Sequence, residues 1–222
     1  MNARRPVFSA VLCDLDGTLV DSRWDIAAAF QHALRLVTGD APVAVCIIRH
    51  IGKPLEHMLR ALGYALSTDQ LSAFFAAYRY HYTHHGMTHT QPFPGVAATL
   101  QRLSITPLGV VTTKAQDQAE MVLQHLELAR FFRHIQGWQP GLRLKPSPDS
   151  IFVTLEALHC PPAQALMVGD TSADILAGRA AGVKTCAVTY GYGPPEELQQ
   201  CMPDYRINSF GELLPLVSEV TR

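Results

Sequence analysis

Two aspartates, Asp14 and Asp16, are the residues with the clearest chemical potential, and they follow a short apolar run. The run over 8–12 predicts a buried strand, because it is apolar and too short for a helix, and Gly17 marks the turn that ends it. Burying two carboxylates at a strand end costs on the order of several kcal/mol unless a partner compensates. Mg²⁺ is the usual partner, since it prefers hard carboxylate oxygens. Asp-x-Asp-Gly also occurs in ordinary turns, so the pair alone leaves a structural role open.

More polar residues stand where later strands are predicted to end. Apolar runs over 108–112, 134–138, 165–169 and 183–188 alternate with helical patterns, which predicts a parallel sheet covered on both faces. The carboxyl ends of parallel strands meet at one edge, where sites form in open sheets. The residues expected at that edge, with Asp14 and Asp16, are Thr112, Thr113, Lys145, Asp170 and Asp174.

This set of residues predicts phosphoryl transfer. Asp14 is the expected nucleophile, which forms an aspartyl-phosphate. Asp16 is expected to protonate the leaving oxygen and then to act as the base for water. Thr112 is expected to donate a hydrogen bond to a phosphoryl oxygen, and Lys145 to neutralise charge that develops in the transition state.

A magnesium site is expected in the same place. Asp14, Asp170 and Asp174 are the predicted carboxylate ligands, and the main-chain carbonyl of Asp16 would complete the protein ligands. Each residue has a plainer interpretation when taken alone, because Asp170 and Asp174 also suit a helix N-terminus. Their joint placement at separate strand ends favours the catalytic interpretation.

The order of the elements predicts two domains. Residues 19–88 carry helical periodicity throughout, whereas the first strand lies before them and the others after them. We therefore predict an α/β protein with a Rossmann-like parallel sheet core, formed by 1–18 and 89–222. The helical segment over 19–88 is predicted to be a cap inserted into one loop of this core.

Composition limits the protein's class and partners. Hydrophobic residues make up 48% of the chain and charged residues 17%, which indicates a globular domain with a real core. The formal charge of −1 gives no basic field for nucleic acid or an anionic membrane. The apolar run before Asp14 is too short for a signal peptide. Five scattered cysteines without a C-x-x-C pair fit reduced thiols, so a cytoplasmic location is expected.

The predicted cap contains three further features. Arg49 and Lys53 flank a loop at Gly52 that is expected to face the active site when the cap closes, where either cation would meet a substrate carboxylate; a surface charge is the alternative. His81 and His85 have the spacing of a metal pair, but a solvated helix end is the favoured interpretation. The aromatic stripe is expected to form the cap's own core, and it consists of Phe74, Phe75, Tyr78 and Tyr82.

Four segments of the chain together resemble the haloacid dehalogenase-like hydrolase superfamily. They are Asp14-Leu15-Asp16-Gly17-Thr18, Val110-Val111-Thr112, Lys145-Pro146-Ser147-Pro148-Asp149 and Val168-Gly169-Asp170-Thr171-Ser172-Ala173-Asp174. The resemblance implies the superfamily's fold, with a helical cap of its first type. A second Asp at position 16 is lacking in similar dehalogenases and phosphonatases, so its presence favours phosphate esters. Thr18 favours phosphatases over sugar-phosphate mutases.

Finer features are similar to the phosphoglycolate phosphatase group, including Ile51-Gly52-Lys53-Pro54-Leu55 and Pro92-Phe93-Pro94-Gly95-Val96. Two positions depart from that group: Thr113 stands where Asn is frequent, and Gly137-Trp138-Gln139 where Gly-Gly-Asp is frequent. The expected substrate-binding residues are Thr18, Thr113, Lys53 and Arg49.

The resulting prediction is a Mg²⁺-dependent phosphatase that hydrolyses a small phosphorylated metabolite, with 2-phosphoglycolate as the best single substrate. The alternatives within the superfamily are a pyrophosphatase, a nucleotidase, and a sugar-phosphate phosphatase or mutase. The alternative outside enzymology is a metabolite-binding protein that has lost catalysis. A monomer or homodimer is expected, with no nucleic-acid or membrane partner.

Overall fold

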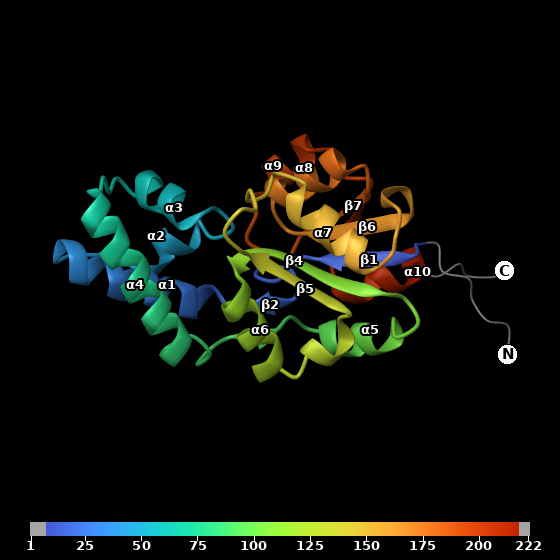
Figure 1. The fold of residues 1–222 in the computed structure, drawn as a ribbon, viewed down its shortest axis with the longest axis horizontal. Coiled ribbons are helices and arrows are strands. Elements are labelled where there is room, and N and C mark those ends of the chain that lie inside the picture. The colour runs from blue at the N-terminus through green and yellow to red at the C-terminus, as the bar shows by residue number, and fades with distance from the viewer. Residues whose placement is uncertain (1–7, 218–222) are drawn as a thin grey trace, which may run out of the picture. The chain divides into compact units, whose positions relative to one another are not determined.

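The computed structural model describes residues 8–217, and the chain divides into two compact units (Figure 1). The core unit comprises residues up to Val20 and from Pro92 onward, and the helical unit comprises Asp21–Gln91. The chain passes between the units twice, where β2 (Val20–Asp21) pairs with β3 (Gln91–Pro92). The division thus falls at 20/21 and 91/92, compared with 18/19 and 88/89 in the prediction.

The core unit is built on a six-stranded parallel sheet, which confirms the predicted α/β class. The strand order is β5-β4-β1-β6-β7-β8, so β1 lies in the middle and its neighbours come from later in the chain. The strands are β1 (Ala10–Cys13), β4 (Leu108–Ala115), β5 (His134–Trp138), β6 (Ala165–Gly169), β7 (Lys184–Val188) and β8 (Tyr205–Ile207).

Helices cover both faces of this sheet (Figure 1). One face carries α7 (Asp149–Ala157) and α8 (Ser172–Ala181), with α9 (Pro195–Gln200) beside α8, and the other carries α5 (Val96–Arg102), α6 (Gln116–His125) and α10 (Leu213–Val217). Three short 3₁₀ turns complete the unit: Ala129–Phe131, Pro162–Gln164 and Phe210–Glu212.

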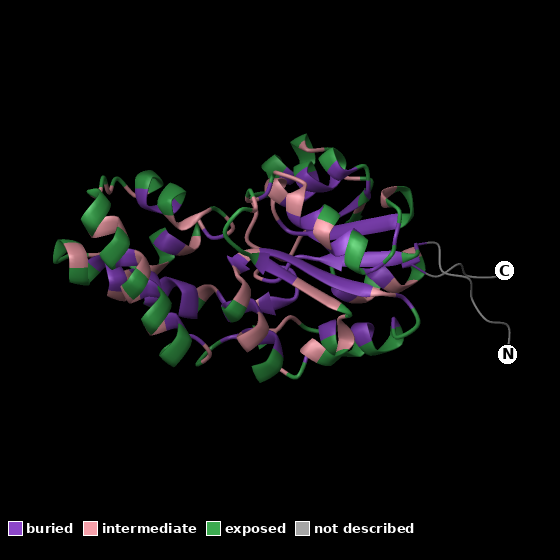
Figure 2. Ribbon diagram, in the orientation of Figure 1, coloured by how far each residue is buried: buried purple, intermediate pink, exposed green. Residues whose placement is uncertain are grey.

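Burial explains why the strand sequences are continuous apolar runs. Every residue of β1 and β6 is buried, as expected for strands that are covered on both faces (Figure 2). Leu12 packs with Val111, Met167 and Ile151 in one core cluster beneath α7 and α8. This packing fixes the position of the loops that follow β1, β4 and β6, and those loops carry the predicted chemistry.

Strand β4 continues to Ala115, three residues beyond the predicted end at Thr112. Its pairing with β5 shifts register between Val111 and Ala115, and the main-chain N–H of Lys114 donates to Thr112 Oγ1 at 3.2 Å. Such irregularities re-aim side chains, and they are frequent next to active sites. Thr112 and Lys114 are both buried here, and Thr113 is half-buried.

The helical unit contains α1 (Arg23–Thr38), α2 (Ala44–Ile48), α3 (Leu55–Ala61) and α4 (Thr68–His85). Helix α4 begins at a capping box in which Ser67 and Gln70 exchange side-chain to main-chain hydrogen bonds. The rings of Phe30 on α1 and Phe74 on α4 meet edge to face at 5.0 Å. Phe74, Tyr78 and Tyr82 are buried and Phe75 is half-buried, so the prediction that the aromatic stripe forms the core of this unit is confirmed for three of its four residues.

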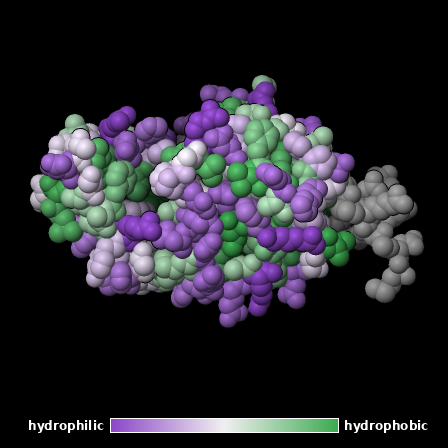
Figure 3. All heavy atoms as spheres, viewed as in Figure 1, coloured by the Kyte–Doolittle hydropathy of each residue, from purple (hydrophilic) through white to green (hydrophobic). Residues whose placement is uncertain are grey.

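Hydrophilic and hydrophobic side chains are interspersed on the face of the molecule in Figure 3. Within residues 8–217, no helix is both long enough and apolar enough to cross a bilayer.

Candidate active site

A tight turn after β1 positions both predicted aspartates. The carbonyl of Leu15 accepts hydrogen bonds from the N–H groups of Leu19 at 2.9 Å and Val20 at 3.0 Å. Gly17 has a φ of +92°, a conformation that favours glycine. A Cβ at Gly17 would also overlap the carboxylate of Asp170, so the turn and the carboxylate can approach each other only because residue 17 lacks a side chain.

Lys145 joins two of the predicted carboxylates. Its Nζ donates to Asp14 Oδ1 at 2.7 Å, to Asp174 Oδ1 at 2.5 Å, and to the carbonyl of Val111 at 2.9 Å. These three acceptors match the three protons of an ammonium group. The side chain of Lys145 is only 4% exposed, and burial alone would lower its pKa. The Asp14 and Asp174 carboxylates instead raise that pKa, so Lys145 carries its charge.

Asp170 follows β6 and is completely buried. Its carboxylate accepts a hydrogen bond from Thr18 Oγ1 at 2.9 Å and another from the N–H of Tyr192 at 2.8 Å. Thr18 was predicted to bind substrate; in the structure it is itself fully buried, and its hydroxyl positions Asp170. Sequence reasoning gave the loop at Tyr192 no site role, although a Cβ at neighbouring Gly191 would overlap Asp170.

Asp174 combines a structural and a site role. Its Oδ2 accepts from the N–H of Thr171 at 2.9 Å and from Thr171 Oγ1 at 2.6 Å, which caps the start of α8. Its Oδ1 accepts from Lys145. One oxygen of Asp174 therefore caps the helix, and the other contacts Lys145, so the two interpretations of this residue are compatible.

The three buried carboxylates fit a divalent cation. Asp14, Asp170 and Asp174 each offer an oxygen, and these oxygens lie within 4.8 Å of one another. Three carboxylates against the single ammonium of Lys145 leave an excess of negative charge that a divalent ion would balance. Burial raises the pKa of Asp14 well above its usual range, and Asp174 and Asp170 raise it further. Burial and Asp174 raise the pKa of Asp170 to about 7. Hard oxygen ligands of this kind suit Mg²⁺.

We expect Mg²⁺ to stabilise the fold more strongly at high pH than at low pH. In the metal-free protein, the pKa of Asp170 is about 7 when folded and about 4 when unfolded. The folded form thus binds more protons between these values, and its stability falls as pH rises through that window. A cation offsets both causes of this loss, which are the burial of the Asp170 charge and its repulsion by Asp174. Thermal melts with EDTA and with MgCl₂ at several pH values between about 5 and 8 measure the difference.

In those melts, Asp170→Asn should flatten the dependence on pH seen in EDTA, because the titrating carboxyl is gone. A stabilisation by Mg²⁺ that is equal at both ends of the pH range would contradict a cation held by these carboxylates.

Asp16 forms an ion pair that sequence reasoning missed. Lys114 Nζ lies 3.1 Å from Asp16 Oδ2, with side-chain exposures of 4% for the lysine and 14% for the aspartate. The sequence did not give this contact, because the predicted strand ended at Thr112 and β4 reaches Lys114 only through its shifted pairing with β5. The structure therefore places a second buried ammonium beside the predicted general acid.

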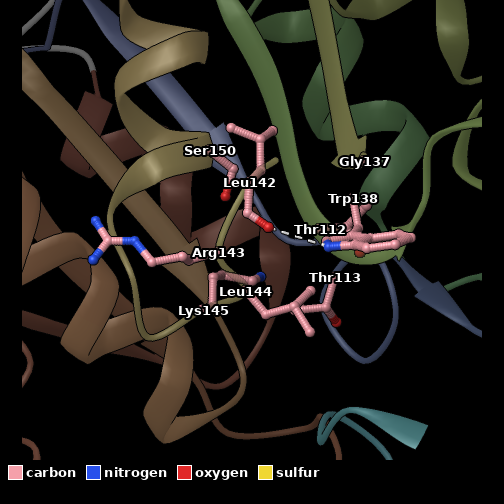
Figure 4. A pocket seen from close by; sticks show the side chains of 9 residues that line it. All are labelled: Thr112, Thr113, Gly137, Trp138, Leu142, Arg143, Leu144, Lys145 and Ser150. Carbon is pink, nitrogen blue, oxygen red and sulfur yellow. Dashed lines mark hydrogen bonds between the residues drawn. The ribbon is translucent and has the colours of Figure 1, made fainter. Parts of the chain in front are cut away.

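A small, partly open pocket lies beside Lys145 and the end of β4 (Figure 4). Thr112 and Thr113 line it, and Trp138 faces them with its indole N–H donating to the carbonyl of Leu142 at 3.2 Å. Two of the positions that depart from the phosphoglycolate phosphatase group, Thr113 and Trp138, thus line one pocket.

Arg49 and Lys53 belong to the helical unit, and both are exposed. Gly52 between them has a φ of +96°, and the N–H of Lys53 donates to the carbonyl of His50 at 3.3 Å. Their predicted contact with substrate stays a prediction.

Comparisons with known proteins identify the family of the chain. A family model described as haloacid dehalogenase-like hydrolase matches residues 11–188. A phosphoglycolate phosphatase from Aquifex aeolicus is 32% identical over 209 residues, covering 93% of this chain and 95% of the relative. A pyrophosphatase PpaX from Halalkalibacterium halodurans is 32% identical over 216 residues, covering 96% and 99%. The structure of a haloacid dehalogenase-like family protein from Streptococcus pneumoniae matches with a TM-score of 0.85 at 34% identity, covering 95% of this chain and 98% of that one.

The chain therefore belongs to the haloacid dehalogenase-like hydrolases, as its four motifs predicted. Within that family it is a phosphatase that resembles the phosphoglycolate phosphatase group.

Proposed function

We propose that this protein is a Mg²⁺-dependent phosphatase that cleaves small phosphate monoesters through an aspartyl-phosphate. The observation that carries the proposal is the buried contact of Lys145 with both Asp14 and Asp174, beside Asp170. This arrangement provides a nucleophile, a charge that neutralises phosphoryl oxygens, and a set of metal ligands at one strand edge.

In the first half of the reaction, an Asp14 oxygen attacks phosphorus and the bond from phosphorus to the leaving oxygen breaks. Asp16 donates its proton to that oxygen, so the alcohol leaves neutral at this atom. Lys145 and the hydroxyl of Thr112 stabilise the charge on the phosphoryl oxygens in the transition state. Asp14, Asp170, Asp174 and the carbonyl of Asp16 would hold Mg²⁺, which would screen the phosphate from the attacking carboxylate.

In the second half, Asp16 accepts a proton from water as the water oxygen attacks phosphorus. The bond between Asp14 and phosphorus breaks, inorganic phosphate leaves, and Asp14 is regenerated as a carboxylate. Asp16 regains its proton for the next cycle. Thr18 holds Asp170 in place throughout, through its hydrogen bond of 2.9 Å.

Lys114 supports a substrate whose leaving group carries its own negative charge. Asp16 must meet the leaving oxygen, and Lys114 Nζ lies 3.1 Å from the Asp16 carboxylate, so the ammonium lies on the leaving-group side. A carboxylate or second phosphate on the leaving group would pair with it. Two of the relatives are named for phosphoglycolate and for pyrophosphate, and both of these compounds have such a leaving group. 2-Phosphoglycolate therefore remains our best single substrate.

Replacing Lys114 by methionine should change substrate preference and leave phosphoryl transfer in place. We expect kcat/KM for 2-phosphoglycolate to fall by about tenfold to hundredfold more than kcat/KM for 2-hydroxyethyl phosphate, which is similar in size and lacks the carboxylate. Steady-state kinetics on both substrates measure the ratio.

Lys184→Met is the matched control. Lys184 begins β7 and pairs at 2.6 Å with Asp204, which directly precedes β8, so this ion pair lies at the edge of the sheet opposite the site. Equal losses on the two substrates with Lys114→Met would overturn the assignment of Lys114 to the leaving group.

The decisive test of the function itself is a panel of phosphate esters assayed with and without Mg²⁺. The panel contains 2-phosphoglycolate, pyrophosphate, a nucleoside monophosphate, hexose phosphates and an aryl phosphate. The proposal is supported if the protein releases phosphate from one class of ester, and if this release requires Mg²⁺. Tight binding of a metabolite without any turnover would instead support a protein that has lost catalysis.

We further propose that the enzyme acts in the cytoplasm, as a monomer or homodimer, on free metabolites. All five cysteines are unpaired thiols, as expected in a reducing compartment. Burial raises the pKa of Cys13 beside the nucleophile, so this thiol is not ionised near neutral pH and does not compete with Asp14.

A further inference from the structure

The loop that follows β7 takes no part in the bond changes at phosphorus, yet it lies against Asp170. Its sequence is Tyr190-Gly191-Tyr192-Gly193, and it leads from β7 to α9. The residue before it, Thr189, is tied to the end of β8: its N–H donates to the carbonyl of Ile207 at 3.0 Å, and its hydroxyl donates to Asn208 Oδ1 at 2.8 Å. The loop therefore starts from a fixed point on the sheet.

This loop fixes both oxygens of the Asp170 carboxylate. The main-chain N–H of Tyr192 donates to Oδ2 at 2.8 Å, and Thr18 Oγ1 donates to Oδ1 at 2.9 Å. Thr18 is in turn held by the loop, because the hydroxyl of Tyr190 donates to its carbonyl at 2.8 Å. A carboxylate oxygen can accept at two sites, so each oxygen keeps one for a cation. The loop thus orients one oxygen directly and the other through Thr18.

The two glycines of the loop are required by space. A Cβ at Gly191 would overlap the Cβ of Asp170 and crowd the carbonyl oxygen of Gly17. A Cβ at Gly193 would overlap the carbonyl oxygen of Asp170. Neither loop glycine has a positive φ, so close approach is the reason for glycine at both positions. The tyrosines make the contacts, and the glycines let the main chain come near enough to make them.

An aromatic contact holds the loop in this position. The ring centre of Phe93 lies 4.8 Å from that of Tyr190 and 6.4 Å from that of Tyr192. The N–H of Phe93 donates to the carbonyl of Leu19 at 3.0 Å, next to Thr18 in the chain. Packing against Phe93 restricts the ring of Tyr190, which keeps its hydroxyl directed at the Thr18 carbonyl.

We infer that Tyr190 is a positioning residue, and that the loop over 190–193 sets the Asp170 carboxylate in the orientation that a divalent cation requires. This inference rests on the proposed function, because it takes Mg²⁺ as the ion that Asp170 holds. Mg²⁺ demands nearly octahedral geometry with oxygen ligands at about 2.0–2.1 Å, so a small rotation of a carboxylate weakens binding. Losing a group that orients a metal ligand typically costs about tenfold to hundredfold in metal affinity.

The test measures Mn²⁺ binding to the full chain by electron paramagnetic resonance, which detects the free ion and needs no turnover. Mn²⁺ takes the same hard oxygen ligands as Mg²⁺. Tyr190→Phe removes one hydroxyl and keeps the ring, and we expect the dissociation constant to rise about tenfold. Gly191→Ala forces Asp170 to move, and we expect a rise of about a hundredfold. Circular dichroism checks that the variants are folded, and Tyr190→Phe tests the inference even if Gly191→Ala fails to fold.

The phosphatase assay gives a second measurement that a loss of stability alone would not change. In Tyr190→Phe, the Mg²⁺ concentration for half-maximal rate should rise by the same factor as the Mn²⁺ dissociation constant. KM for the phosphate ester should change far less, and excess Mg²⁺ should recover most of the lost rate. Such a split places the effect on cation binding.

Tyr205→Phe and Gly211→Ala are the matched controls, because they make the same chemical changes elsewhere in the core unit. Tyr205 begins β8, at the end of the strand opposite the site. A Cβ at Gly211 would meet only Thr99 Oγ1, at an ordinary contact distance of 3.9 Å. Both variants should bind Mn²⁺ with the wild-type dissociation constant.

Two outcomes would overturn the inference, and they separate it from the proposed function. Wild-type Mn²⁺ affinity in folded Tyr190→Phe and Gly191→Ala would overturn it and leave the proposed function intact. A wild-type protein that binds no Mn²⁺ and shows no Mg²⁺-dependent release of phosphate would overturn both.

Discussion

Asp14→Asn is expected to lower the rate of phosphate release by about 10⁴-fold or more. The amide cannot attack phosphorus as the carboxylate does. An amide has nearly the same size as a carboxylate, and its oxygen can still accept the hydrogen bond from Lys145, which spans 2.7 Å in the wild type. Initial rates on an aryl phosphate with saturating Mg²⁺ measure the loss.

Asp204→Asn is the control for this loss, because Asp204 pairs with Lys184 at the amino-terminal ends of β7 and β8, whereas Asp14 follows the carboxyl end of β1. It should retain wild-type rates. Mass spectrometry of quenched wild-type enzyme should also show one added phosphoryl group that Asp14→Asn lacks. Turnover by Asp14→Asn at the wild-type rate would exclude the covalent mechanism.

Asp16→Asn should separate the two carboxylates by role. The variant keeps the nucleophile but cannot protonate the leaving oxygen, so hydrolysis of an alkyl phosphate should fall by about 10³-fold. An aryl phosphate has a leaving group that departs without a proton, so formation of the aspartyl-phosphate should be affected far less. Because the variant also lacks the base for water, the phosphoenzyme should accumulate.

Rapid-quench measurements with an aryl phosphate detect this accumulation as a burst of the released phenol. The control is Asp14→Asn, which should show no burst. Equal loss on alkyl and aryl substrates in Asp16→Asn, without a burst, would show that Asp16 acts in some way other than as acid and base.

Much of the fold was predictable, because short apolar runs indicate the strands and helical periodicity indicates the inserted segment. The apolar runs at β1 and β6 are buried on both faces, and such runs differ plainly from the periodic helices between them. The extent of β4 was not predictable in the same way. Its last residues, Thr113 to Ala115, are polar or small, and they continue the strand only because β5 pairs with Ala115 after a register shift.

The candidate site divides along similar lines. Asp14, Asp170 and Lys145 could be assigned to one edge, because strand ends are readable and parallel strands align them. Other contacts could not be assigned in this way. One oxygen of Asp174 accepts from Thr171 and the other from Lys145, and the hydroxyl of Thr18 donates to Asp170. The contacts with Lys145 and Thr18 depend on distances of a few ångströms between loops that are far apart in the sequence. No periodicity encodes such contacts.

Strands β2 and β3 pair with each other, so the two ends of the inserted helical segment are adjacent. Both ends of the inserted segment leave the core at one place, where the N–H of Phe93 also donates to the carbonyl of Leu19 at 3.0 Å. An insert with adjacent ends can be lengthened, shortened or replaced without altering the order of the strands. Selection can therefore act on a new substrate by recombining this segment, while the residues that break and form the bonds to phosphorus stay as they are.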